Sequence, residues 1–138
     1  MKVVLDNNII LASISPFSKF RSILDRFEQG DYILCVTTDI MLEYEEKLAQ
    51  NFNPVVAELF TSGLLLKKNV AFTNVFFNWR LIYPDMDDNK FADCAIAANA
   101  DYLVTNDRDF RVLKQVEFPK IMLLKMDEFI EVLQIENR

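Results

Sequence analysis

Residues 85–107 read DMDDNKFADCAIAANADYLVTND, an acidic turn followed by a helix of small residues and a short apolar strand. The spacing predicts a helix over residues 88–99, because apolar side chains recur along one face of it. These side chains are Phe91, Cys94, Ala95 and Ala98. The strand predicted at 101–105 follows at once and ends in a polar turn. A helix joined to a strand by so short a connection is typical of an α/β fold with a parallel sheet.

The rest of the chain continues this alternation. Further strands are predicted at 2–5, at 32–37, within 70–79 and at 121–124. Helices are predicted at 15–29, from a cap at 38 or 39 to about 48, at 54–68, at 110–114 and at 127–133. The strands are continuously apolar, as in a parallel sheet that is buried on both faces. We therefore predict one domain over residues 1–138, a three-layer α/β fold with a mostly parallel central sheet and helices on both faces.

The composition excludes most classes of enzyme. The chain has no histidine, which excludes Ser-His-Asp and Cys-His catalysis and zinc bound by histidine. Its two glycines, Gly30 and Gly63, open no phosphate-binding loop. The two cysteines, Cys35 and Cys94, are expected to be reduced thiols in the core. Any catalysis is therefore expected to use carboxylates.

Charge and hydropathy limit the partners and the location. The net charge of −6 opposes a polyanionic partner unless bound divalent cations reverse the local field. No apolar run reaches the roughly 20 residues of a membrane span, and no signal peptide is evident. We expect a cytoplasmic protein that does not enter a membrane.

Three acids are predicted at the carboxyl edge of the sheet. Asp6 follows the first strand and Asp107 follows the strand 101–105, so parallel packing makes them neighbours if the strands are close. Either one alone reads equally well as a turn former. Glu43 lies one turn into the next helix at the same edge, but Glu45 and Glu46 lie beside it. The sequence by itself leaves this choice open.

A fourth acid comes from the helix 88–99, where Asp88 and Asp93 compete. Asp88 lies at the edge of the apolar stripe at the helix start, whereas Asp93 projects to the far side. An acid on the buried side of a helix N-terminus is a cap or a ligand, and one on the polar side is usually solvated. This favours Asp88 and keeps Asp93 as the alternative. Carboxylates gathered in this way suit Mg²⁺ or Mn²⁺.

These residues resemble the PIN-domain ribonucleases, particularly bacterial members described as toxins of toxin–antitoxin pairs. The resemblance rests on residues 3–8 (VVLDNN), Glu43, residues 85–91 (DMDDNKF) and residues 95–107 (AIAANADYLVTND). It runs along nearly the whole chain, and its last stretch is the most specific. It implies a PIN-like fold and a metal-dependent endoribonuclease.

The resemblance also assigns roles to individual residues. The family's metal-binding acids fall on Asp6, Glu43, Asp88 and Asp107. The segment 93–98 (DCAIAA) imitates the context of an acid in related toxins, which keeps Asp93 as an alternative.

The resemblance also concerns three residues that lie next to these acids in the sequence. Thr105 would place a hydroxyl beside the metal ligands, and Asn8 would orient Asp6. Asn7 stands where the family usually has threonine, and its amide can donate a similar hydrogen bond.

The resemblance implies RNA as the substrate, Mg²⁺ or Mn²⁺ as the cofactor and an antitoxin protein as a partner. Homodimers are common in the family, and the aromatic segment 70–79 reads either as an interface or, preferably, as core. Two other classes compete with the ribonuclease. One is a phosphatase or receiver with a similar sheet, although Asn8 replaces the second acid that such phosphatases need. The other is a catalytically inactive PIN-fold module for protein interaction.

Overall fold

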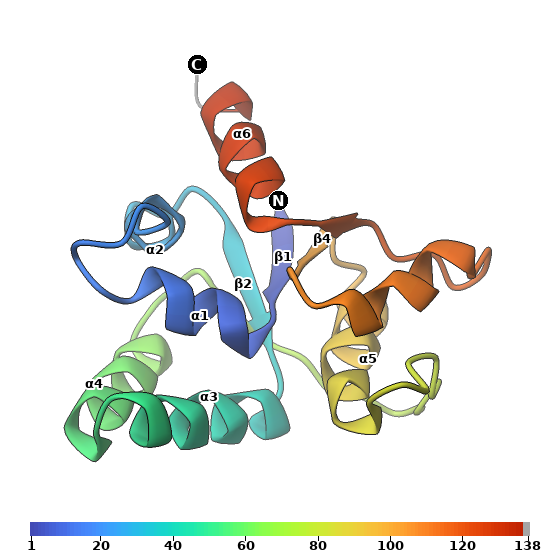
Figure 1. Ribbon diagram of the computed structural model, residues 1–138, viewed down its shortest axis with the longest axis horizontal. Coiled ribbons are helices and arrows are strands. Elements are labelled where there is room, and N and C mark those ends of the chain that lie inside the picture. Colours follow the sequence, from blue (N-terminus) through green and yellow to red (C-terminus); the bar gives the residue numbers. More distant parts are fainter. Residues whose placement is uncertain (137–138) are drawn as a thin grey trace.

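The computed structural model describes residues 1–136, which contain a single parallel sheet with the strand order β3-β2-β1-β4-β5 (Figure 1). The strands are β1 Lys2–Leu5, β2 Ile33–Val36, β3 Val70–Phe72, β4 Tyr102–Val104 and β5 Leu123–Leu124. β1 is the central strand, and its residues Val3, Val4 and Leu5 are completely buried, as is typical of a parallel sheet covered on both faces. The predicted mostly parallel sheet is confirmed, and every strand pair in it is parallel.

Helices cover both faces of this sheet. They are α1 Asn7–Ser13, α2 Ser22–Glu28, α3 Thr38–Asn51, α4 Pro54–Leu65, α5 Asn89–Ala97 and α6 Met126–Glu136, with 3-10 helices η1 Met86–Asp88 and η2 Arg108–Gln115. In Figure 1, α1 to α4 lie on one side of the strands and α5 lies on the other. Right-handed crossovers require this division, because the chain moves outward from β1 to β3 and then returns across β1 to β4. The predicted three-layer α/β fold is therefore confirmed.

The first connection differs from the prediction. Residues Asn7–Ser13 form α1 where no helix was predicted, and the helix predicted at 15–29 is reduced to Ser22–Glu28. The reason is that Asp, Asn and Ser serve the N-terminus of a helix as well as a turn. Here Ile9 and Ile10 follow and are buried against the core, so the helical conformation is the one that gains from packing.

The N-cap of α3 was also misplaced, by one or two residues. Thr37, rather than Thr38 or Asp39, is the cap, and its Oγ1 accepts a hydrogen bond from the Ile40 N–H at 3.1 Å. The remaining helices agree with the prediction to within a few residues. Both cysteines are free and buried, as expected. Within residues 1–136, no helix is long and apolar enough to cross a membrane.

A long extended segment, residues 73–85, connects β3 to η1, and we call it the strap. The sequence favoured a core position for its aromatic residues, and this was wrong for Phe76 and Phe77, which are 92% and 62% exposed. Only Trp79 among its aromatic residues is half-buried, and it contacts Phe77 and Phe118 edge to face. The strap is rich in apolar residues but runs mostly over the surface, and Ile82 is its one completely buried side chain.

Candidate metal centre

Asp6 lies at the carboxyl end of the central strand. Its side chain is almost fully buried, and its backbone N–H donates to the Val104 carbonyl at 3.1 Å. The strand order reverses between β1 and β4, so Asp6 lies at the switch point where open parallel sheets bind ligands. The apolar strand before it fixes the position of this carboxylate.

Thr105 connects Asp6 to Asp107. The Thr105 hydroxyl donates to Asp6 Oδ2 at 2.8 Å and accepts from the Asp107 N–H at 3.0 Å. Asp107 then caps η2, because its Oδ1 accepts from the Asp109 N–H at 2.9 Å. The Thr105 hydroxyl therefore links two of the predicted acids, Asp6 at the end of β1 and Asp107 after β4.

The pKa of Asp6 indicates that other acids lie near it. Burial raises the pKa of Asp6 to about 6, although hydrogen bonds from Thr105 and from the Asn7 backbone oppose this shift. The charges of Asp107 and Glu43 raise the pKa of Asp6 further. Asp107, which follows β4, and Glu43 in α3 thus each lie close enough to Asp6 to repel its carboxylate.

Glu43 is positioned by its neighbour in α3. The Tyr44 hydroxyl is buried and donates to the Leu5 carbonyl, which ties this turn of α3 to the end of β1. Glu43 Oε1 accepts from Lys90 Nζ at 3.0 Å, and Oε2 is buried without a hydrogen-bond partner. Glu45 and Glu46 are exposed, so the structure brings Glu43 alone of these three acids to the site.

Asp88 is buried at the start of α5. It occupies the N-cap position but makes no capping hydrogen bond with its side chain, and its Oδ2 is buried without a partner. Burial raises the pKa of Asp88 to about 7, and repulsion from Asp6, Asp85 and Asp107 adds to the shift. The sequence analysis expected an acid at this position to be either a helix cap or a ligand, and the Asp88 side chain does not cap the helix.

Asp93 lies elsewhere. The helical spacing put it on the polar side of the helix, yet it is buried, because the strap covers that side of α5. Its Oδ1 accepts from the Trp79 N–H at 3.1 Å, and burial raises its pKa. One turn earlier, Asn89 exchanges hydrogen bonds with the N–H and carbonyl of Ile82 at 2.9 and 3.0 Å. Asp93 thus helps to hold the strap against α5.

The two asparagines after Asp6 are also placed differently from the expectation. Asn8 is exposed and, within residues 1–136, makes no hydrogen bond to Asp6, because α1 rotates its side chain toward solvent. Asn7 Oδ1, in contrast, is buried without a partner. Its backbone N–H, rather than its amide, donates to Asp6.

The sequence analysis missed three charged residues at this edge. Carboxylate oxygens of Asp85, Asp88 and Asp109 lie within 4.8 Å of one another, and no other group of three within residues 1–136 is so close. Asp85 begins the acidic run 85–88, and Asp109 follows Asp107 by two residues, which were the available signals. Lys90 is the third, through its ion pair with Glu43.

The unsatisfied oxygens at this edge suit a cation. Within residues 1–136, the buried side-chain atoms without a partner are Asn7 Oδ1, Glu43 Oε2 and Asp88 Oδ2. All three are acceptors, and each comes from a residue beside or facing Asp6. Buried acceptors are rarely left unpaired, and hard oxygen donors of this kind are the ligands that Mg²⁺ and Mn²⁺ prefer. The residues present therefore fit a divalent metal.

Comparisons with known proteins agree with this geometry. The sequence pattern of the PIN domain matches residues 2–109. The chain is also similar to one in the crystal structure of VapBC2 from Rickettsia felis bound to a DNA fragment from their promoter. That match has a TM-score of 0.62 and 18% identity, and it covers 91% of this chain and 98% of the other. No curated protein matches the chain.

Proposed function

Because the chain belongs to the PIN domain family, we propose that it is an endoribonuclease that depends on Mg²⁺ or Mn²⁺. The observation that carries the proposal is the set of carboxylates around Asp6, two of which keep a buried oxygen without a partner. Such an arrangement is costly without a cation, since buried like charges repel and buried acceptors lose their hydrogen bonds to water. A metal site removes both costs.

We assign the metal to Asp6, Glu43, Asp88 and Asp107. Of these four acids, Asp88 is the one that also belongs to the close group with Asp85 and Asp109. Bound Mg²⁺ or Mn²⁺ would supply Lewis acidity, which strengthens water as a nucleophile and offsets the charge that builds on the phosphate. Thr105 holds Asp6 and Asp107 in register through its two hydrogen bonds. Burial of Asp6 and Asp88 limits access of bulk water to the carboxylates.

We further propose that the chain is the toxin of a toxin–antitoxin pair and that a small antitoxin protein inhibits it. Support comes from the shared fold with the VapBC2 chain over almost the full length of both chains. An inhibitor of this kind would keep a growth-arresting ribonuclease inactive in its own cell.

The direct test is cleavage of a mixed single-stranded RNA in the presence of Mn²⁺ or Mg²⁺. The wild-type chain is expected to cut, and EDTA or Asp6→Asn is expected to abolish cutting by at least about a hundredfold, because the central carboxylate is lost. Glu45→Gln, on an exposed position of α3, serves as the control and should retain activity. Cleavage by Asp6→Asn at the wild-type rate would refute the mechanism.

The competing function is a catalytically inactive module for protein interaction. Exposed apolar side chains favour it, among them Phe17, Leu66 and Phe76, which are 96%, 85% and 92% exposed. The buried, unpaired carboxylate oxygens favour the nuclease, because a binding module gains nothing from them. A folded wild-type chain that neither binds Mn²⁺ nor cuts RNA would favour the module.

A further inference from the structure

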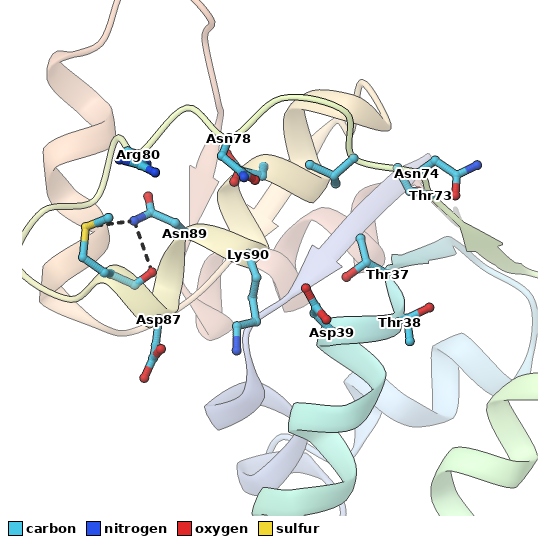
Figure 2. Close-up of a pocket in the computed structure, with 13 residues that line it drawn as sticks. Thr37, Thr38, Asp39, Thr73, Asn74, Asn78, Arg80, Asp87, Asn89 and Lys90 are labelled. Atoms are coloured by element: carbon cyan, nitrogen blue, oxygen red, sulfur yellow. Dashed lines mark hydrogen bonds between the residues drawn. The ribbon is translucent and has the colours of Figure 1, made fainter.

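A polar cleft of about 570 Å³ opens beside the acidic residues, between the strap and the start of α3 (Figure 2). Of the thirteen residues that line it, only Val75 and Met86 are apolar. The volume is that of a site for a small organic group. A lining of amides, hydroxyls and charges suits a ligand rich in hydrogen-bonding groups and does not suit an apolar one.

The cleft shares a wall with the candidate metal centre. Lys90 lines the cleft, and its Nζ bonds Glu43 Oε1 at 3.0 Å. Asp87 and Asn89, which flank Asp88 in the chain, line the cleft as well. A phosphodiester chain with one phosphate at the carboxylates of the metal centre would therefore have its neighbouring unit at the mouth of this cleft.

Arg80 supplies a free cation on the opposite wall. Figure 2 shows it on the strap, with Lys90 on α5. Its backbone has a φ of 54°, a conformation that is uncommon for residues other than glycine and is often found at functional sites. Within the part of the chain that the structure describes, its guanidinium makes no hydrogen bond or ion pair. The group is thus available to a phosphate, which arginine can bind with two parallel hydrogen bonds.

The strap also presents two carboxamides to the cleft. Asn74 and Asn78 are exposed, and both line it. Each carboxamide offers donors and an acceptor, the pattern that reads the edge of an unpaired base. Thr38 on the α3 side adds a hydroxyl. Three carboxylates also line the opening: Asp39 and Asp87 are exposed, and Asp93 accepts the hydrogen bond from the Trp79 N–H. The unpaired guanidinium and the amides nevertheless match a nucleotide better than a peptide.

We propose that this cleft binds one nucleotide of single-stranded RNA next to the phosphate at the acidic residues. Arg80 contacts a backbone phosphate, and Asn74 and Asn78 contact the base edge. The inference rests on the proposed ribonuclease function and adds to it a source of sequence preference. It also gives this acidic chain a local cationic contact for a polyanion, which its net charge of −6 otherwise disfavours.

The first test measures RNA binding without cleavage, in the Asp6→Asn background with Mn²⁺ present. The probe is a fluorescein-labelled single-stranded RNA ten-mer of random sequence, and the readout is anisotropy at several salt concentrations. Arg80→Gly removes the guanidinium and suits the positive φ. It should weaken binding about five- to tenfold and reduce the salt slope by about one. Arg80→Lys should restore part of the affinity, and Lys68→Ala, an exposed lysine before β3, should change nothing.

The second test sequences the ends of RNA fragments cut by chains that retain Asp6. The double substitution Asn74→Ala/Asn78→Ala should change the base composition next to the cut while Mn²⁺ affinity stays the same. If Arg80→Gly binds RNA like its parent and the double variant keeps the wild-type end composition, the cleft assignment is overturned.

Failure of the cleft and failure of the proposed function give different results. The cleft assignment alone falls if Asp6→Asn abolishes cutting while the cleft variants behave like the wild type. If the wild-type chain cuts no RNA but Arg80→Gly still weakens RNA binding, the cleft assignment stands and the ribonuclease proposal falls.

Discussion

Asp6 and Asp88 are buried carboxyl groups whose pKa values are raised to about 6 and about 7. Both values come mainly from burial, and both rise further because the acids repel one another. When no metal is bound, each carboxyl group is therefore protonated up to a higher pH in the folded chain than in the unfolded chain. At neutral pH, the ionised carboxylates of Asp6 and Asp88 therefore each destabilise the metal-free folded chain.

This cost predicts a pH dependence of stability in EDTA. The pKa of Asp6 is higher in the folded chain than its ordinary value of 3.8, so its contribution is fully present below about pH 4 and is lost as the pH rises through 6. The loss is worth about 3 kcal/mol at most. Asp88 extends the same decline to about pH 7. Asp6→Asn should flatten the decline and stabilise the metal-free chain at pH 7.5, as measured by urea unfolding.

The matched control for this measurement is Glu45→Gln, which changes an exposed acid of α3. Its pH profile should follow that of the wild type. Equal slopes for Asp6→Asn and the wild type between pH 4 and 7 would mean that burial of Asp6 carries no such cost.

At the scale of elements, α5 has two separate tasks. The 3-10 turn before it, η1, ends in the N-cap Asp88 and carries this carboxylate toward the other acids, while Asn89 and Asp93, four residues apart, face the strap. Residues four apart lie on one face of a helix, which explains why one helix can attach the strap and still contribute an acid to the site. Asp93 thereby has a structural partner that Asp88 lacks.

This division predicts opposite results for two conservative substitutions. Asp93→Asn keeps an acceptor for the Trp79 N–H, so Mn²⁺ affinity and RNA cleavage should stay within about twofold of the wild type. Asp88→Asn should weaken Mn²⁺ binding at least about tenfold, since it removes a charged ligand. Isothermal titration with Mn²⁺ measures the affinity of each variant. If only Asp93→Asn lost affinity, Asp93 would be the metal ligand and Asp88 would not.

The attachment of the strap can be tested separately. Asn89→Ala removes the hydrogen bonds with Ile82 and leaves its buried N–H and carbonyl unpaired. Unfolding by denaturant should show a loss of about 2–3 kcal/mol. Gln50→Ala, which removes an exposed amide from α3, should cost much less. Equal losses would show that the strap does not depend on Asn89.

For the whole molecule, folding and metal binding are expected to be coupled. The carboxyl ends of β1 and β4 gather acids from distant parts of the chain only when the sheet is complete. The unfolded chain has no such site, so a metal that binds here stabilises the folded state.

Mn²⁺ should therefore raise the melting temperature of the wild-type chain by several degrees. At a free concentration of one hundred times Kd, the gain in the free energy of unfolding is about 2.7 kcal/mol. Differential scanning fluorimetry with increasing MnCl₂ measures it, and Asp6→Asn should show a smaller shift at each concentration. An unchanged melting temperature at millimolar Mn²⁺ would contradict the metal site.

The amino-acid sequence by itself determined the parallel three-layer fold. Continuous apolar runs such as Val3-Val4-Leu5 and the stripe of α5 are local patterns, and a sheet buried on both faces is the packing that removes them from water. The positions of Asp6 and Asp107 followed from the same patterns, since Asp6 directly follows β1 and Asp107 lies in the short turn after β4.

Only the tertiary structure decided where the other side chains point. Glu43 was separated from Glu45 and Glu46 by the bond from Tyr44 to β1, and Asp93 was buried by a strap that no periodicity describes. The fold of α1 was misjudged because Asp6, Asn7 and Asn8 suit a turn and a helix start equally, and burial of Ile9 and Ile10 chose the helix. Local propensity fixes which elements form, whereas contacts between residues far apart in sequence fix which acids meet.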